Sequence, residues 1–271
     1  GDHRDLHSFP TRRSSDLSDV SVFVSYQNEK KEDFSRLSLK AILSSPDGKA
    51  IKTIVSKLNS LNSNLLFKVE NPLLWTAETP SLYKLELILA RGKNILERKV
   101  QQIGIRQTGI ENGILKLNGS PLKLRGVDHH DLVPETGRTL TREQILYDLK
   151  LIQKGNINFI RTSHYPPDRR MLDMCDSLGI YVMCEVPFGG GDSHLTDSTY
   201  QDILLMRAES TLHRDKNHPS VIIWSIGNEN PLTPITEVVG KYVQNSDPTR
   251  PICYPQTGRY FYTNYKSFPD F

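Results

Sequence analysis

Two patterns of hydrophobic and polar residues divide this chain near residue 110. Before that point, short segments alternate apolar and polar positions, as at Val20, Val22 and Val24, which is typical of strands with one buried face. Turn residues separate these segments at positions 46–48 (Pro-Asp-Gly) and 91–94 (Arg-Gly-Lys-Asn). Because no helical segment interrupts them, we predict a small antiparallel β-sandwich over residues 18–110.

Beyond residue 110, predicted strands alternate with predicted helices. Residues 221–226 are almost entirely apolar, which indicates a strand buried on both faces, as parallel sheets use. Thr141 and Gln144 have the spacing of a capping box and predict the start of a helix. The alternation continues to a fifth strand at 251–254, so we predict the first five strands of a (β/α)8 TIM barrel over residues 111–271.

The first 17 residues show neither the two-residue period of a strand nor the 3.6-residue period of a helix. Their positive and negative charges cancel. They lack the charged start and apolar core of a signal peptide and resemble a translated sequencing adaptor. We expect this segment to be foreign, and disordered or loosely attached. Since a closed barrel needs three further strand–helix units, we also expect a sequence truncated at both ends, with its cellular location unknown.

Composition narrows the class of protein. Hydrophobic residues make up 37% and charged residues 24%, which suits a globular protein. The net charge of +3 predicts no nucleic-acid partner, and no apolar run approaches the ~20 residues of a membrane span. The three cysteines, Cys175, Cys184 and Cys253, lack the spacing of a disulfide framework or zinc site, so we interpret them as small buried hydrophobic residues.

Polar and titratable residues follow each of the first four barrel-type strands. In chain order they are Asp128, His129, His130 and Asp131; Arg161, Thr162, Ser163 and His164; Glu185; and Asn228 and Glu229. Carboxyl ends of parallel strands meet at one end of a barrel, so this repetition predicts a binding pocket there. Adjacent strand residues point to opposite faces, which argues against a metal held by the residues at 128–131.

Simpler interpretations stay open for two of these positions and for Trp224. Arg161 is expected to hold the barrel rim if it pairs with Glu185 or Glu229. His164 is a structural histidine if it bonds a backbone carbonyl. Trp224 is expected to serve packing rather than sugar stacking.

Several ordered motifs resemble glycoside hydrolase family 2. They are residues 74–83 (LWTAETPSLY), 118–127 (NGSPLKLRGV), 134–138 (PETGR), 161–166 (RTSHYP) and 217–229 (NHPSVIIWSIGNE). The resemblance implies an immunoglobulin-like sandwich followed by the catalytic barrel of a retaining β-glycosidase, acting on a carbohydrate with a terminal β-linked sugar.

The resemblance also implies roles for individual residues. Glu229 matches the general acid/base, a role that requires a raised pKa in a partly buried site. Asn228 matches the amide that hydrogen-bonds the sugar 2-hydroxyl. His164 and His130 match histidines that hold sugar hydroxyls, and Arg161 matches an arginine beside them.

Departures from the family pattern limit what is implied. The family's nucleophile is a glutamate on a later strand, beyond Phe271, and Glu185 matches a different, supporting position. The family allows magnesium, but its ligand motif, a Glu and a His two residues apart, is absent from residues 184–191, so we predict no cofactor and no metal site. The motif at residues 134–138 favours a β-galactosidase. The glycine-rich segment at residues 189–191 resembles β-glucuronidases instead, which are the second candidate. An inactive structural or carbohydrate-binding remnant is the alternative from another class, and an oligomer is left open for the full-length protein.

Overall fold

A computed structural model describes residues 6–12, 17–26, 34–188, 195, 197–230 and 232–255, with backbone alone for 6–12 and 35. The chain divides into two compact units. One contains Gly1–Gln107 with Asn217–Pro219, and the other contains Thr108–Lys216 with Ser220–Phe271. This division falls three residues before the expected domain boundary.

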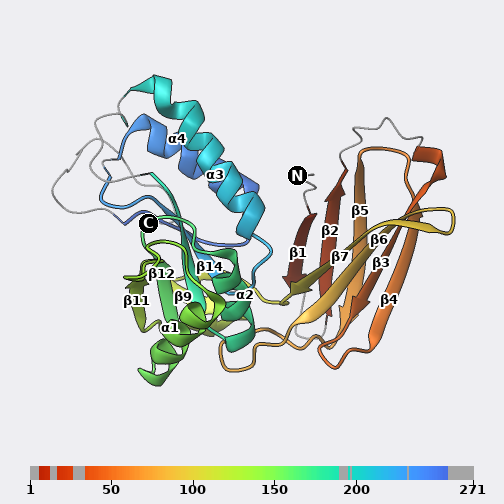
Figure 1. Cartoon of the computed structure of the whole chain (residues 1–271), viewed down its shortest axis with the longest axis horizontal. Coiled ribbons are helices and arrows are strands. Elements are labelled where there is room, and N and C mark those ends of the chain that lie inside the picture. The colour runs from red at the N-terminus through yellow and green to blue at the C-terminus, as the bar shows by residue number, and fades with distance from the viewer. Residues whose placement is uncertain are drawn as a thin grey trace. The chain divides into compact units, whose positions relative to one another are not determined.

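The first unit is a β-sandwich of two antiparallel sheets in the described residues. The strand orders are β1-β2-β5 and β4-β3-β6-β7. The strands, with one 3₁₀ turn, are β1 (Leu6–Arg12), β2 (Leu17–Ser25), η1 (Phe34–Arg36), β3 (Leu37–Ser44), β4 (Ala50–Lys57), β5 (Asn62–Glu70), β6 (Tyr83–Arg91) and β7 (Asn94–Ile103). Figure 1 shows these strands in red to yellow. The fold is the predicted immunoglobulin-like sandwich.

Alternating side chains form the sandwich core, as the sequence pattern predicts. Val20, Val22 and Val24 of β2 are buried, and so are Leu39 and Leu85 on the facing sheet. The predicted hairpin at 91–94 joins β6 to β7, and its Gly92 has a φ of 58°, which glycine adopts without steric cost.

Strand β1 lies inside the segment that was expected to be disordered. Leu6–Arg12 pairs with β2 in an antiparallel register, from Leu6 opposite Val24 to Arg12 opposite Ser18. The expectation of disorder is therefore wrong for these seven residues. Backbone N–H and C=O groups of a sheet edge accept a further strand without any hydrophobic alternation in it, so the sequence pattern gave no signal. Residues 1–5 and 13–16 lie outside the described residues, and a foreign origin stays a prediction.

The second unit begins with a small antiparallel sheet and continues as a partial TIM barrel. The small sheet contains β8 (Thr108–Glu111), β9 (Ile114–Leu117) and β10 (Ser120–Pro121). The barrel elements are β11 (Gly126–His129), α1 (Arg142–Lys154), β12 (Phe159–Thr162), α2 (Arg169–Leu178), β13 (Tyr181–Val186), η3 (Ser198–Tyr200), α3 (Gln201–Asp215), β14 (Val221–Ile226), α4 (Pro234–Ser246) and β15 (Ile252–Cys253).

The described barrel strands form one parallel sheet in chain order, β11-β12-β13-β14-β15. Helices α1 and α2 lie side by side, and so do α3 and α4 (Figure 1). The predicted capping box of α1 is present, because Gln144 N donates to Thr141 Oγ1 and Thr141 N donates to Gln144 Oε1. Within the described part of the chain, no helix combines the length and hydropathy that crossing a membrane requires.

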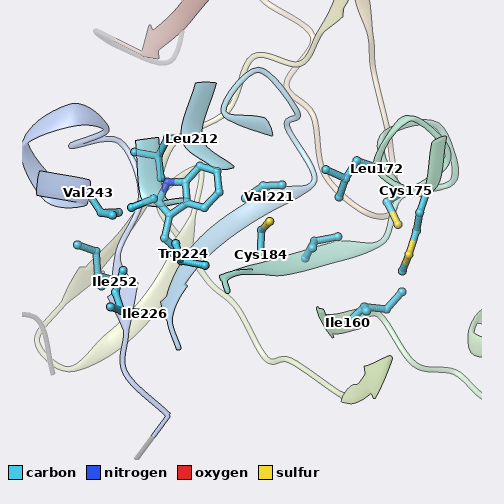
Figure 2. Packing of buried hydrophobic residues seen from close by; sticks show 14 of the residues in the cluster. Ile160, Leu172, Cys175, Cys184, Leu212, Val221, Trp224, Ile226, Val243 and Ile252 are labelled. Carbon is cyan, nitrogen blue, oxygen red and sulfur yellow. The ribbon is translucent and has the colours of Figure 1, made fainter. Parts of the chain in front are cut away.

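A hydrophobic layer holds the helices to the parallel sheet (Figure 2). Trp224 of β14 is fully buried there, with Leu212 of α3 and Val243 of α4 beside it. Its packing role is confirmed. Cys175 and Cys184 are free and buried in the same layer, as expected, whereas Cys253 is only partly buried.

Candidate active site

Side chains on the two faces of the parallel sheet point into different surroundings. Trp224 Nε1 donates to Asp247 Oδ2 at 2.8 Å, at the end of α4, so Trp224 points into the helix layer. Ser225, the next residue of β14, faces the opposite side because side chains alternate along a strand. It lies in register with Glu185 of β13. The site therefore lies on the face turned away from the helices.

Glu185 is fully buried and forms the centre of a polar cluster. Its Oε2 accepts from Arg161 Nε at 2.9 Å and from Ser225 Oγ at 2.8 Å. The same oxygen forms an ion pair with Arg161 Nη2 at 2.7 Å. His164 Nδ1 lies 2.9 Å from the other oxygen, Oε1. Burial raises the pKa of the Glu185 carboxyl above its ordinary value, while the Ser225 hydroxyl and the Arg161 charge act in the opposite direction.

These contacts decide two of the open interpretations. Arg161 does pair with Glu185, as the rim interpretation proposed. His164 contacts a carboxylate rather than the backbone carbonyl considered for it.

Arg161 of β12 also contacts residues at the ends of two other barrel strands, β11 and β14. Its Nη2 donates to Asn228 Oδ1 at 2.7 Å, just after β14, and its Nη1 lies 3.4 Å from Asp128 Oδ1 on β11. The exposed ring of His130 stands edge-on to His164, with ring centroids 5.3 Å apart. The structure thus brings together four of the five predicted site residues: Arg161, His164, His130 and Asn228.

Glu229, the fifth predicted residue, lies next to Asn228 in the chain but is exposed. Its backbone N–H donates to Pro255 O at 2.9 Å, and its φ of 53° is in the left-handed region. No hydrogen bond or ion pair joins its carboxyl to another described residue. The partial burial expected for it is therefore not observed, since the five described strands form only part of the ring that would surround it.

A tight turn fixes the backbone that carries Asn228 and Glu229. Gly227 has a φ of 79°, and a Cβ added there would lie 2.5 Å from Asn230 Oδ1. The buried Asn230 accepts from Asn228 N at 2.9 Å through that same oxygen. Its carbonyl accepts from Tyr254 Oη at 2.7 Å. Several hydrogen bonds and close contacts therefore fix the turn, and they allow Glu229 to keep a positive φ.

His129 points away from this cluster, as strand alternation predicts. Its Nε2 lies 3.2 Å from Asp148 Oδ2 of α1, and its Nδ1 lies 3.5 Å from Asp131 Oδ1. Burial lowers the pKa of His129, but the two carboxylates outweigh it and raise the pKa above its ordinary value. His129 and Asp128 therefore have different partners, and the absence of a metal at residues 128–131 stays a prediction.

The described part of residues 184–191 does not fit a galactosidase-type magnesium site. Its one carboxylate, Glu185, is engaged by Arg161, and a second cation beside a guanidinium is electrostatically unfavourable. Val186 and Phe188 are apolar and buried in the core. Residues 189–191 lie outside the described residues, and the expectation of no metal stays a prediction.

Two residues of this region were missed by sequence reasoning. Ser225 stands inside an apolar strand, and its polarity on a strand buried on both faces was the available signal. Asn230 carries no such signal, because its role in the turn depends on the backbone geometry of Gly227 and Glu229.

Comparison with known proteins identifies the family. "Glycosyl hydrolases family 2" matches residues 7–106, and "Glycosyl hydrolases family 2, TIM barrel domain" matches residues 108–268. A β-galactosidase of Lactococcus lactis subsp. lactis is 38% identical over 195 residues, covering 69% of this chain and 19% of its own length. The chain therefore spans about a fifth of that relative.

Solved structures agree with this assignment. A β-glycosidase from Bacteroides vulgatus superposes with a TM-score of 0.83 at 27% identity, covering 95% of this chain and 34% of its own. β-Glucuronidase 3 of Bacteroides uniformis gives 0.80 at 27% identity, covering 92% and 32%. Both domains, their order and the fold of each agree, and we conclude that this chain belongs to glycoside hydrolase family 2.

Proposed function

We propose that this chain is part of a retaining exo-β-glycosidase that removes terminal β-galactosyl residues. The observation that carries the proposal is the joining of Arg161, His164 and Asn228 at the carboxyl ends of strands β12 and β14. Donors and acceptors that converge at this end of a barrel suit a polyhydroxylated ligand. The β-galactosidase relatives support galactose as the sugar.

Glu229 is our candidate for the general acid/base. A retaining glycosidase needs one carboxyl group to protonate the leaving oxygen and later to take a proton from water. Glu229 follows strand β14, beside the Asn228 amide, and its carboxyl is accessible to a ligand. We assign the nucleophile to no residue of this chain.

The remaining residues bind and orient the sugar in this proposal. Asn228 hydrogen-bonds the 2-hydroxyl, a contact that strengthens in the transition state. His164 and His130 hold other hydroxyls, and Arg161 keeps Asn228 and His164 in position. Glu185 belongs to the supporting cluster, because both of its oxygens are already engaged.

Replacement of Glu229 by Gln in the full-length gene product tests the assignment. Loss of general acid catalysis is expected to lower kcat/KM about 10²–10⁴-fold, most for aryl β-galactosides with poor leaving groups. Glu209→Gln removes an exposed carboxylate on α3 and serves as the matched control. Undiminished turnover of a poor leaving group by Glu229→Gln would remove Glu229 from the mechanism.

A β-glucuronidase is the second candidate. The Bacteroides uniformis β-glucuronidase superposes on this chain with a TM-score of 0.80, against 0.83 for the Bacteroides vulgatus β-glycosidase. Parallel assays of aryl β-galactosides and aryl β-glucuronides on the same preparation distinguish the two. Turnover of the glucuronide alone would replace galactose in the proposal and leave the role of Glu229 in place.

A further inference from the structure

The hydrogens of Arg161 can be accounted for atom by atom around Glu185. Nη2 carries two hydrogens, and it lies 2.7 Å from Glu185 Oε2 and 2.7 Å from Asn228 Oδ1. One hydrogen is donated to Asn228 Oδ1, and the contact with Glu185 Oε2 is an ion pair. Nη2 also lies 3.3 Å from His164 Nδ1, a longer contact than the 2.9 Å between that nitrogen and Glu185 Oε1.

This accounting fixes the orientation of the Asn228 amide. A guanidinium group has five donors and no acceptor, so the amide atom that faces it must be the carbonyl oxygen. The amide NH₂ then lies on the remaining side of the group. The NH₂ of Asn228 is thereby left to donate hydrogen bonds to a ligand.

The same reasoning fixes the tautomer of His164. Glu185 is ion-paired with Arg161 and also accepts from Ser225, so its carboxylate is an acceptor at Oε1 as well. His164 Nδ1, 2.9 Å from Oε1, must then carry the hydrogen. In the neutral imidazole the other nitrogen, Nε2, is left as a hydrogen-bond acceptor.

We propose that Glu185 is a positioning residue that sets the hydrogen-bond polarity of the sugar site, with Asn228 donating to one hydroxyl and His164 accepting from another. The inference rests on the proposed function for the identity of the ligand. Glu185 touches no substrate itself and acts through Arg161 and His164. Ser225 contributes by directing the shared oxygen, Oε2.

The tautomer of His164 is the direct test. Nitrogen-15 NMR of the 271-residue chain at neutral pH is expected to show His164 protonated at Nδ1 and not at Nε2. The His164→Gln variant identifies the signals by their loss. Protonation at Nε2, alone or together with Nδ1, would overturn the proposal in the unmodified protein, without reliance on the folding of a variant.

The Glu185→Gln variant is expected to show the opposite tautomer of His164. Arg161 Nε and Ser225 Oγ donate to Oε2, and Arg161 Nη2 is ion-paired with it, so the glutamine oxygen should occupy that place and its NH₂ should face His164. The amide then donates to Nδ1, and the proton of His164 moves to Nε2. Glu209→Gln, with the same change of charge on α3, should leave the tautomer unaltered.

Binding of galactose and its single-site deoxy and fluoro analogues to the full-length gene product tests the consequence for the ligand. Fluorine accepts a hydrogen bond weakly and donates none, and one lost bond corresponds to about tenfold weaker binding. At the 2-position, facing Asn228, fluorine should restore part of the loss caused by hydrogen. At the hydroxyl held by His164, fluorine and hydrogen should be equally unfavourable, and His164→Ala identifies that position by abolishing the penalty.

The outcomes separate the two proposals. If fluorine restores affinity at the hydroxyl held by His164, the positioning role of Glu185 is overturned and the proposed function stays intact. If neither galactose nor glucuronic acid binds, the proposed function fails, and the tautomer still decides whether Glu185 orients His164.

Discussion

The buried carboxylate of Asp247 should make the second unit sensitive to acid. Asp247 is fully buried at the end of α4 and forms an ion pair with Arg250. It also accepts from Trp224 Nε1 at 2.8 Å and from Thr249 N at 3.1 Å. Burial raises its pKa, but the Arg250 charge and these hydrogen bonds outweigh burial and hold the pKa at about 2, against 3.8 for an ordinary aspartate.

The sign and size of the effect follow from that difference. Because the folded pKa is lowered, the stabilisation is present above pH 3.8 and is lost as the pH falls towards about 2. The lowered pKa corresponds to about 2 kcal/mol of unfolding free energy. Asp247→Asn should cost more, about 3–5 kcal/mol at neutral pH, because it leaves the buried Arg250 without its counter-charge.

Denaturant unfolding from pH 7 to pH 2 measures both quantities. The chain has two tryptophans, of which Trp75 lies in the sandwich unit and Trp224 in the second unit. Fluorescence in a Trp75→Phe background therefore follows the second unit. Glu209→Gln on α3 is the control for a lost surface charge. An Asp247→Asn variant that loses less than about 1 kcal/mol, or that keeps the acid-dependent loss of the parent, would refute the reasoning.

Three further predictions follow from the described contacts. Gly227→Ala should destabilise the second unit by about 2 kcal/mol, because an alanine at a φ of 79° is strained and its Cβ meets Asn230; equal denaturation midpoints would contradict this. The raised pKa of His129 means that its stabilisation is complete below pH 6.5 and is lost as pH rises through the folded pKa. His129→Gln should therefore flatten the stability profile there, and an unchanged profile would be the opposite result. Finally, we expect no turnover of aryl β-galactosides by the 271-residue chain, because we assign the nucleophile to none of its residues. Measurable hydrolysis would contradict this expectation.

Local signals in the sequence were sufficient for the order of elements. The capping box at Thr141 and Gln144, the apolar run of β14 and the hairpin at 91–94 all lie where they were predicted. Each depends on residues close in the chain, through capping, burial of a whole strand or a glycine turn. The polar residues after four strands also indicated the correct end of the barrel, because parallel strands share that end.

Contacts between distant residues needed the tertiary structure. The sequence offered Arg161, His164, Glu185 and Asn228 as neighbours in a pocket, but their order of pairing depends on strand register and side-chain direction. The role of Ser225 came from its position opposite Glu185 across two strands, which no local pattern encodes. The sequence determined which chemical groups gather at the barrel end, through period and strand direction. Only the tertiary structure decided which of them donate, which accept and which stay exposed, because the side-chain bonds of Glu185 and Asn228 join residues 21 to 67 positions apart.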